Sequence, residues 1–111
     1  MVAVSPTWTV AEARAYLPRL RELVLLVQDG VALDAASGEL RLRPGAEHAE
    51  AALDELLDRG IILRQLPHGL VDFPSEGDDG ELRFLCWQVG EPDLAWWHRP
   101  EDGYAGRRPL A

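Results

Sequence analysis

The sequence lacks residue types that several common catalytic chemistries need. It contains no lysine and no asparagine, one cysteine and three serines in 111 residues. Without lysine there can be no Schiff-base lysine, no lysine general base and no phosphate-binding lysine of the P-loop kind. No serine lies in the Gly-x-Ser-x-Gly setting of a nucleophile, and no glycine-rich dinucleotide fingerprint occurs. These absences exclude several standard routes to catalysis.

The single cysteine, Cys86, also limits covalent and metal chemistry. It cannot form an internal disulfide, and there is no cysteine pair for a zinc ribbon or a redox motif. No apolar run approaches the roughly 18 residues of a membrane span. The first residues also lack the basic and apolar regions of a signal peptide. We therefore expect a soluble cytoplasmic protein that does not bind a membrane.

Positive charge is scarce in this acidic chain. The net charge is −8 at pH 7, and acidic residues outnumber arginines in both halves. No face is basic enough to follow a phosphate backbone, so the composition argues against nucleic-acid binding. The length is that of one domain, and we expect residues 1–111 to form it.

The hydrophobic pattern changes its period at Gly60, which predicts the fold class. Before it, apolar residues recur at helical spacing and predict helices at about 9–29, with a capping box of Thr9 and Glu12, and at about 46–59. Residues 31–43 are either a short hairpin or an extended connector. After Gly60, alternation predicts an antiparallel sheet over about 61–98 and then a surface tail, 99–111. We expect an α+β fold, with two N-terminal helices packed on a C-terminal three- to four-stranded antiparallel sheet.

The tryptophans near the end of the chain predict an interface. A three-residue loop at 90–92 would pair Phe84 with His98 and Cys86 with Trp96. Strand alternation then places Trp96 and Trp97 on opposite faces, with Leu94 on the Cys86 face and Trp87 on the Trp97 face. Because two helices can cover only one face, the tail, a second subunit or a ligand must cover the other. The candidate interface residues are Trp87, Trp96 and Trp97.

Four polar residues beside these apolar runs form the candidate site: Asp72, Glu91, His98 and Arg107. Two carboxylates and an imidazole can ligate a divalent metal ion or act as acid and base, and Arg107 can bind a carboxylate or another anion. The structural alternative is that Asp72 pairs with an arginine such as Arg107. An isolated buried charge is costly, so we expect Asp72 and His98 in one polar cluster with Arg107 or a bound cation. Cys86 is expected to pack as a small buried hydrophobe.

The last third of the chain contains a string of short motifs, which are GLVDFP at 69–74, LCW at 85–87, GE at 90–91, WH at 97–98 and GYAGR at 103–107. Together these motifs resemble a prokaryotic family, the domain of unknown function 2203. The segment TVAEARAYLP at 9–18 is similar to the first helix of that family. The likeness covers roughly residues 7–29 and 45–110. It implies one domain and the strand assignment given above, and it implies no activity.

The sequence favours a domain that acts by binding over an enzyme, because no nucleophile–base pair or spaced metal motif is present. Self-association would use the aromatic sheet face or the broad apolar stripe of the first helix, which Leu23, Leu25 and Leu26 widen. The alternative is a metal-dependent or acid–base enzyme that uses Asp72, Glu91 and His98, with a divalent metal ion as cofactor. Neither substrate nor small-molecule ligand can be named from the sequence.

Overall fold

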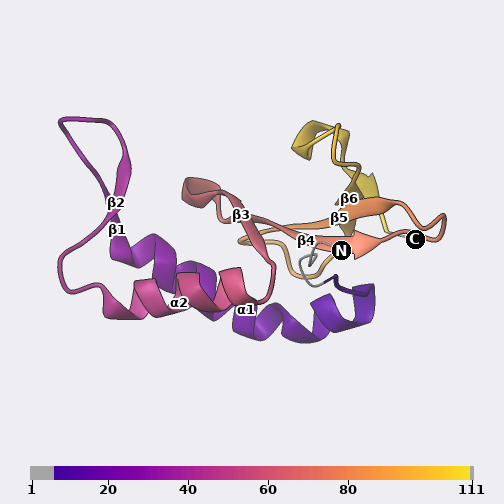
Figure 1. Cartoon of the computed structure of the whole chain (residues 1–111), viewed down its shortest axis with the longest axis horizontal. Helices are drawn as coiled ribbons and strands as arrows, with labels where there is room; N and C mark the ends of the chain where they lie inside the picture. Colours follow the sequence, from indigo (N-terminus) through magenta and orange to yellow (C-terminus); the bar gives the residue numbers. More distant parts are fainter. Residues whose placement is uncertain (1–6, 111) are drawn as a thin grey trace, which may run out of the picture.

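The computed structural model describes residues 7–110 of the chain, which contain two α-helices and seven short strands. The α+β class is confirmed (Figure 1). In chain order the elements are α1 (Val10–Gly30), β1 (Val31–Leu33), β2 (Leu40–Leu42), α2 (Glu47–Asp58), β3 (Ile62–Gln65), β4 (Leu70–Glu76), β5 (Leu82–Gln88), β6 (Trp96–His98) and β7 (Arg108–Pro109), with single 3₁₀ turns η1 (Leu66–His68) and η2 (Tyr104–Gly106).

Helix α1 begins at the predicted capping box and provides most of the helical core. The Thr9 hydroxyl accepts from the Glu12 amide at 3.1 Å, and the Glu12 carboxylate accepts from the Thr9 amide at 2.9 Å. The helix continues through Pro18 to Gly30. Its buried side chains follow one helical stripe: Ala13, Leu17, Leu20, Leu23, Val24 and Val27. This stripe packs against Val71, Phe73, Leu85 and Trp87 of the sheet.

Helix α2 lies beside α1 (Figure 1), and this corrects the predicted packing. We expected both helices to pack on the sheet, but α2 contacts the sheet mainly at β3. Its buried residues, Ala49, Ala52 and Leu56, lie at helical spacing and pack mainly toward α1. Gly60, with φ of +71°, follows the helix in the left-handed conformation that glycine adopts without strain.

The sheet has five strands in the order β3-β4-β5-β6-β7, each antiparallel to the next. It is therefore larger than the predicted three to four strands, and it extends beyond residue 98. The expected surface tail contributes β7, which pairs Trp96 with Pro109 and Trp97 with Arg108. A two-residue strand that contains proline has no alternating pattern, so its sequence gave no sign of this pairing. No described helix is long and apolar enough to cross a membrane.

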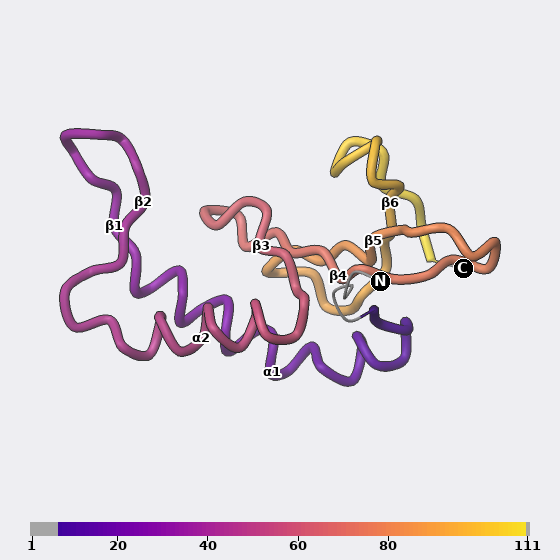
Figure 2. Tube along the Cα trace, viewed as in Figure 1, coloured from indigo at the N-terminus to yellow at the C-terminus, as the bar shows by residue number. Residues whose placement is uncertain are grey.

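Residues 31–43 form a hairpin, one of the two structures that the sequence left open. Leu33 pairs with Leu40, and Val31 pairs with Leu42. The hairpin begins directly after Gly30 and stands at the end of the helix pair, away from the five-stranded sheet (Figure 2).

The predicted register between β5 and β6 is confirmed at its three observed pairs, which join Phe84 to His98, Leu85 to Trp97 and Cys86 to Trp96. Strand β6 begins only at Trp96, so the connection is longer than predicted. Leu94 consequently lies in the helix-side core rather than on the Cys86 face. We call the face without the helices the outer face; it carries Asp72, Phe84, Cys86, Trp96 and His98.

Candidate metal centre

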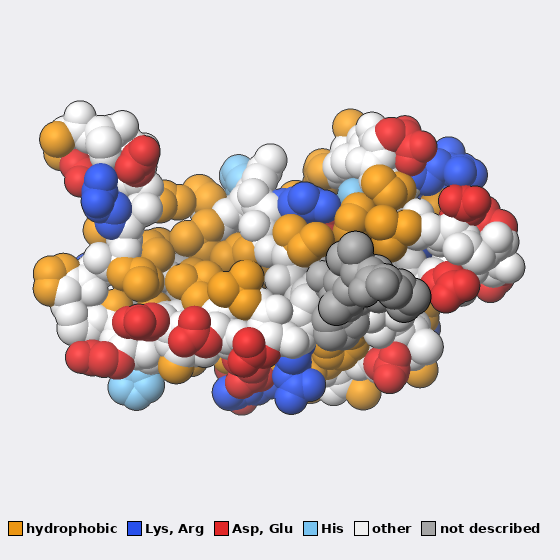
Figure 3. Space-filling model, viewed as in Figure 1, with side chains coloured by type: hydrophobic (Ala, Val, Ile, Leu, Met, Phe, Trp, Pro, Cys, Tyr) orange, Lys and Arg blue, Asp and Glu red, His pale blue; other side chains and the backbone are white. Residues whose placement is uncertain are grey.

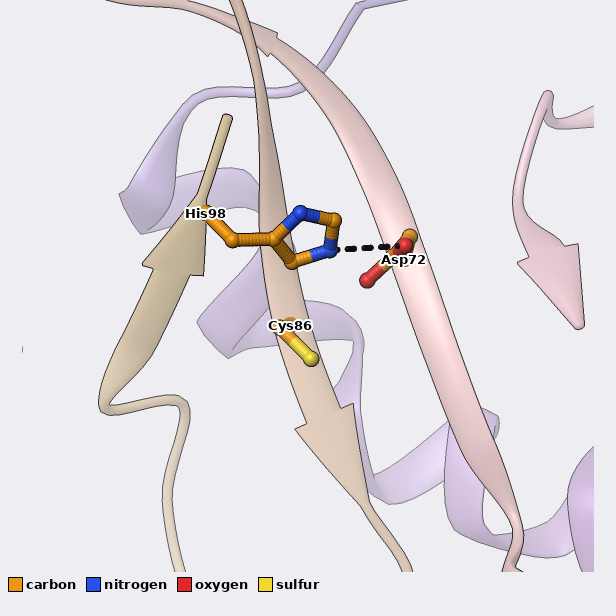
Figure 4. A group of neighbouring side chains, drawn as sticks. All are labelled: Asp72, Cys86 and His98. Atoms are coloured by element: carbon orange, nitrogen blue, oxygen red, sulfur yellow. Dashed lines mark hydrogen bonds and ion pairs between the residues drawn. The ribbon is translucent and has the colours of Figure 1, made fainter. Parts of the chain in front are cut away.

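Three neighbouring strands bring Asp72, Cys86 and His98 together on the outer face (Figure 4). Asp72 on β4 stands opposite Cys86 on β5, and His98 on β6 lies two residue pairs further along β5, opposite Phe84. All three are buried, with exposed fractions of 1%, 0% and 3% respectively. One potential ligand atom from each residue lies within 4.8 Å of the other two. The predicted convergence of Asp72 and His98 is thus present.

The Asp72 carboxylate has one well-bonded oxygen and one unpaired oxygen. Its Oδ2 lies 2.9 Å from His98 Nε2 and accepts from Arg64 Nε at 2.9 Å. Its Oδ1 is buried and has no hydrogen-bond partner among residues 7–110. A buried carboxylate oxygen without a partner is costly, so this atom is the natural contact for a further donor or a cation.

The surroundings of His98 fix how its ring can act. Its Nδ1 lies 2.8 Å from the Arg99 carbonyl oxygen, which can only accept, so Nδ1 carries a hydrogen. Its Nε2 faces Asp72. With both nitrogens engaged inside the protein, His98 has no free nitrogen to exchange a proton with a substrate. The same orientation is usual for a histidine that ligates a metal through Nε2, because its Nδ1–H is held by a carbonyl.

Cys86 is buried as predicted, but its environment is polar as well as apolar. Burial, with a contribution from the negative charge of Asp72, raises the pKa of the Cys86 thiol to about 12, although Arg107 opposes this. The thiol is therefore protonated at neutral pH and is a poor nucleophile. A bound dication would reverse this state, because a thiol that coordinates a metal ion gives up its proton.

Glu91 and Arg107 form a separate pair instead of joining Asp72. The Arg107 guanidinium donates to both Glu91 oxygens, at 3.0 Å and 2.7 Å, and its Nη2 also donates to the Cys86 carbonyl at 3.3 Å. Glu91 further accepts from the Gln88 amide at 2.7 Å. The expectation that Arg107 would pair with Asp72 is therefore wrong. Glu91 is also absent from the group of potential ligands around Asp72.

Arg64, and not Arg107, is the arginine that pairs with Asp72. It lies where the pairing of β3 with β4 shifts, between the pairs formed by Leu63 and Gln65. It donates to Asp72, and its guanidinium lies 5.0 Å from the centre of the Phe84 ring. The sequence signal for it was weak, because a shift in register is not visible in a pattern of apolar residues.

The three candidate interface tryptophans have different surroundings. Trp87 has no exposed surface, and its indole N–H donates to the Glu91 carbonyl at 3.1 Å, so it is unavailable to a partner. Trp96 and Trp97 occupy successive positions of β6, on opposite faces as predicted, and both are partly buried. The tail itself covers them, with Arg107 over Trp96 and Arg108 over Trp97. The tail was one of three covers that the sequence allowed.

A pocket of about 340 Å³ opens beside the centre. Asp72 and His98 line it, whereas Cys86 does not. The remaining lining residues are Arg64, Gln65, Leu70, Pro100, Gly103 and Tyr104. Asp72 and His98 thus form part of the pocket wall, although they are only 1% and 3% exposed.

Comparison with known proteins agrees with the resemblance seen in the sequence. No curated protein matches the chain, and no solved structure does. Residues 27–110 match the model of a family described as "Uncharacterized conserved protein (DUF2203)". The matched range includes Asp72, Cys86, Glu91, His98 and Arg107, but it omits residues 9–26 of the segment around α1, which also resembles the family. Because the match covers most of the chain, the protein belongs to the DUF2203 family.

Proposed function

We propose that this domain binds a divalent transition-metal ion between Asp72, Cys86 and His98. The observation that carries the proposal is the convergence of three ligand types, one from each of three adjacent strands, within 4.8 Å. Carboxylate oxygen, thiolate sulfur and imidazole nitrogen are the groups that bind zinc in proteins. Two ligands of one tetrahedral ion lie roughly 3–4 Å apart, given bonds of about 2.0–2.3 Å. Small side-chain rotations would therefore complete the site.

Two further features support this ligand set. Asp72 Oδ1 is buried without a partner, and the Arg99 carbonyl holds His98 in the tautomer that offers Nε2. Cys86 replaces Glu91 in the set that we predicted from the sequence. A thiolate favours zinc, cobalt or copper over magnesium and calcium. We also keep a cytoplasmic location within this proposal, since a reducing compartment maintains Cys86 as a thiol.

Metal titration of the purified chain tests the proposal. After treatment with a chelator, the protein is titrated with Co²⁺ and Zn²⁺, and bound metal is measured by elemental analysis. We expect one ion per chain, with the absorption bands of a thiolate bound to tetrahedral Co²⁺. Asp72→Asn, Cys86→Ser and His98→Gln should each lose this binding, and circular dichroism checks that each variant is folded.

The matched control is His48→Gln, which removes an exposed imidazole on α2. It should bind metal as the unmodified chain does. Absence of a bound ion in the unmodified chain would overturn the proposal. Equal binding in the Cys86→Ser and His98→Gln variants would do so as well, because the ion would then lie elsewhere.

We propose self-association as a second function, and a group of exposed leucines favours it. Leu33, Leu40 and Leu42 share one face of the β1–β2 hairpin, and Leu33 is 67% exposed. Leu25 and Leu26 at the end of α1 are also exposed. Figure 3 shows hydrophobic side chains gathered between the hairpin and the helices. An apolar patch of this kind usually marks an interaction site, and a second copy of the chain would cover it.

Analytical ultracentrifugation over a range of protein concentrations tests self-association. We expect a dimer or larger oligomer that dissociates in the double variant Leu33→Ser, Leu40→Ser. Leu82→Ser is the control, because Leu82 is 49% exposed but lies on β5, away from the hairpin. A monomer at high micromolar concentration would remove this second proposal and leave the metal proposal intact.

A further inference from the structure

The metal site proposed above would have an open coordination position that faces a pocket. This step rests on that proposed function. Three protein ligands leave one position of a tetrahedral ion vacant, as in zinc sites that bind water or substrate. Asp72 and His98 line the pocket of about 340 Å³, whereas Cys86 is fully buried and does not. An ion held by all three side chains would therefore have its sulfur ligand on the protein side and its free position toward the pocket.

Besides Asp72 and His98, the polar lining of this pocket has three side chains that can donate hydrogen bonds, which are Arg64, Gln65 and Tyr104. Arg64 uses Nε for Asp72, and its terminal nitrogens donate to no described residue. The Tyr104 hydroxyl and the side-chain amide of Gln65 also form no hydrogen bond with another residue in the range 7–110. The other walls include the apolar side chains of Leu70 and Pro100. A guanidinium and a phenol beside an apolar wall suit an anion that has a short organic part.

Charge counting gives the sign and size of the ligand charge. A dication bound to the carboxylate of Asp72 and the thiolate of Cys86 forms a neutral unit, because His98 contributes no charge as a ligand. Arg64 then adds one positive charge at the pocket wall. The neighbouring Glu91–Arg107 pair is neutral as a whole. The loaded site would thus carry one uncompensated positive charge, which a monoanion would balance.

We infer that the pocket binds a small organic carboxylate. One carboxylate oxygen would occupy the free position on the metal, and the other would accept from the terminal nitrogens of Arg64. The volume is near the lower end of the roughly 300–1,000 Å³ that is usual for small-molecule sites. A short carboxylic acid fits within this volume.

Titration of the cobalt-loaded protein with acetate and propionate tests this inference, with chloride and inorganic phosphate as comparison anions. We expect both carboxylates to shift the cobalt absorption bands saturably, with propionate binding at least as tightly as acetate. Arg64→Gln should weaken carboxylate binding roughly tenfold or more, since it removes a charged hydrogen bond. Tyr104→Phe, which leaves Asp72 and His98 untouched, should weaken it less.

Arg83→Gln is the matched control, because Arg83 packs on Trp97 of the opposite sheet face. It should leave carboxylate affinity unchanged, and cobalt stoichiometry is measured in every variant. If cobalt binds but no carboxylate shifts its spectrum, the inference is overturned and the metal proposal stands. A chloride effect as large as that of acetate, and independent of Arg64, would also overturn it. Failure of cobalt to bind at all would overturn both.

Discussion

Asp72 and His98 lie on β4 and β6, two strands that are separated by β5, yet their side chains meet at 2.9 Å. They reach across the intervening strand, and Cys86 of that strand completes the group beneath them (Figure 4). This contact joins the middle three strands through their side chains. It also places an acid, a thiol and an imidazole in one buried location of a chain with few other reactive groups.

Replacing Asp72 with alanine should destabilise the metal-free protein. Arg64 would lose its acceptor, and the buried Nε2 of His98 would lose its partner. We expect the free energy of unfolding, measured with urea in the presence of a chelator, to fall by about 1–3 kcal/mol. Zinc should raise the melting temperature of the unmodified protein and leave that of the variant unchanged. A variant with unaltered stability and unaltered metal content would show that the carboxylate has neither role.

Removing the Arg107 side chain should loosen the tail without affecting metal binding. Arg107 forms an ion pair with Glu91, donates to the Cys86 carbonyl and lies over the Trp96 ring. The side chains of Arg107 and Glu91 are mostly buried. Arg107→Met keeps much of the side-chain volume, and we expect it to cost about 1–3 kcal/mol because Glu91 loses its partner. Amide exchange should become faster in residues 104–110, while one cobalt ion still binds per chain. Loss of the ion in this variant would place Arg107 within the metal site instead.

The predicted register of β5 and β6 was correct although the connection is longer than the assumed turn at 90–92, because the longer connection is still centred on Glu91. The pairing of Cys86 with Asp72 was harder to predict from the sequence, because it depends on the register across the acidic loop that joins β4 to β5. The Arg64 contact depends on a register shift, and β7 on hydrogen bonds such as the 2.8 Å bond from the Leu110 amide to the Ala95 carbonyl. Such backbone details leave no periodic trace in a sequence. Local patterns thus predicted which residues share a face and missed which arginine reaches Asp72.

Cys86 should react slowly with thiol reagents in the folded, metal-free protein. Its side chain is fully buried, and burial together with the Asp72 charge raises the pKa of the thiol to about 12. We expect the rate of modification by iodoacetamide at pH 8 to be far below that of the urea-unfolded chain. Mass spectrometry of both samples measures this difference. A folded protein that reacts as fast as the unfolded one would contradict the described burial.

Part of the stability of the folded protein should be lost in acid because the Glu55 carboxylate becomes protonated. Hydrogen bonds from Arg19, first, and from the Tyr16 hydroxyl lower the pKa of the Glu55 carboxyl from 4.5 to about 2. Because the folded pKa is the lower one, this stabilisation is complete above pH 4.5 and is lost as the pH falls from 4.5 through 2. The effect should be about 1 kcal/mol, since Arg19 is half exposed and water screens the pair. Urea unfolding between pH 2 and 6 should therefore show a weaker acid dependence in Glu55→Gln than in the unmodified chain. The control is Glu50→Gln, which changes an exposed residue of the same helix and should leave the acid dependence as it is. An equal change in both variants would show that overall charge, and not the contact with Arg19 and Tyr16, sets the acid limit.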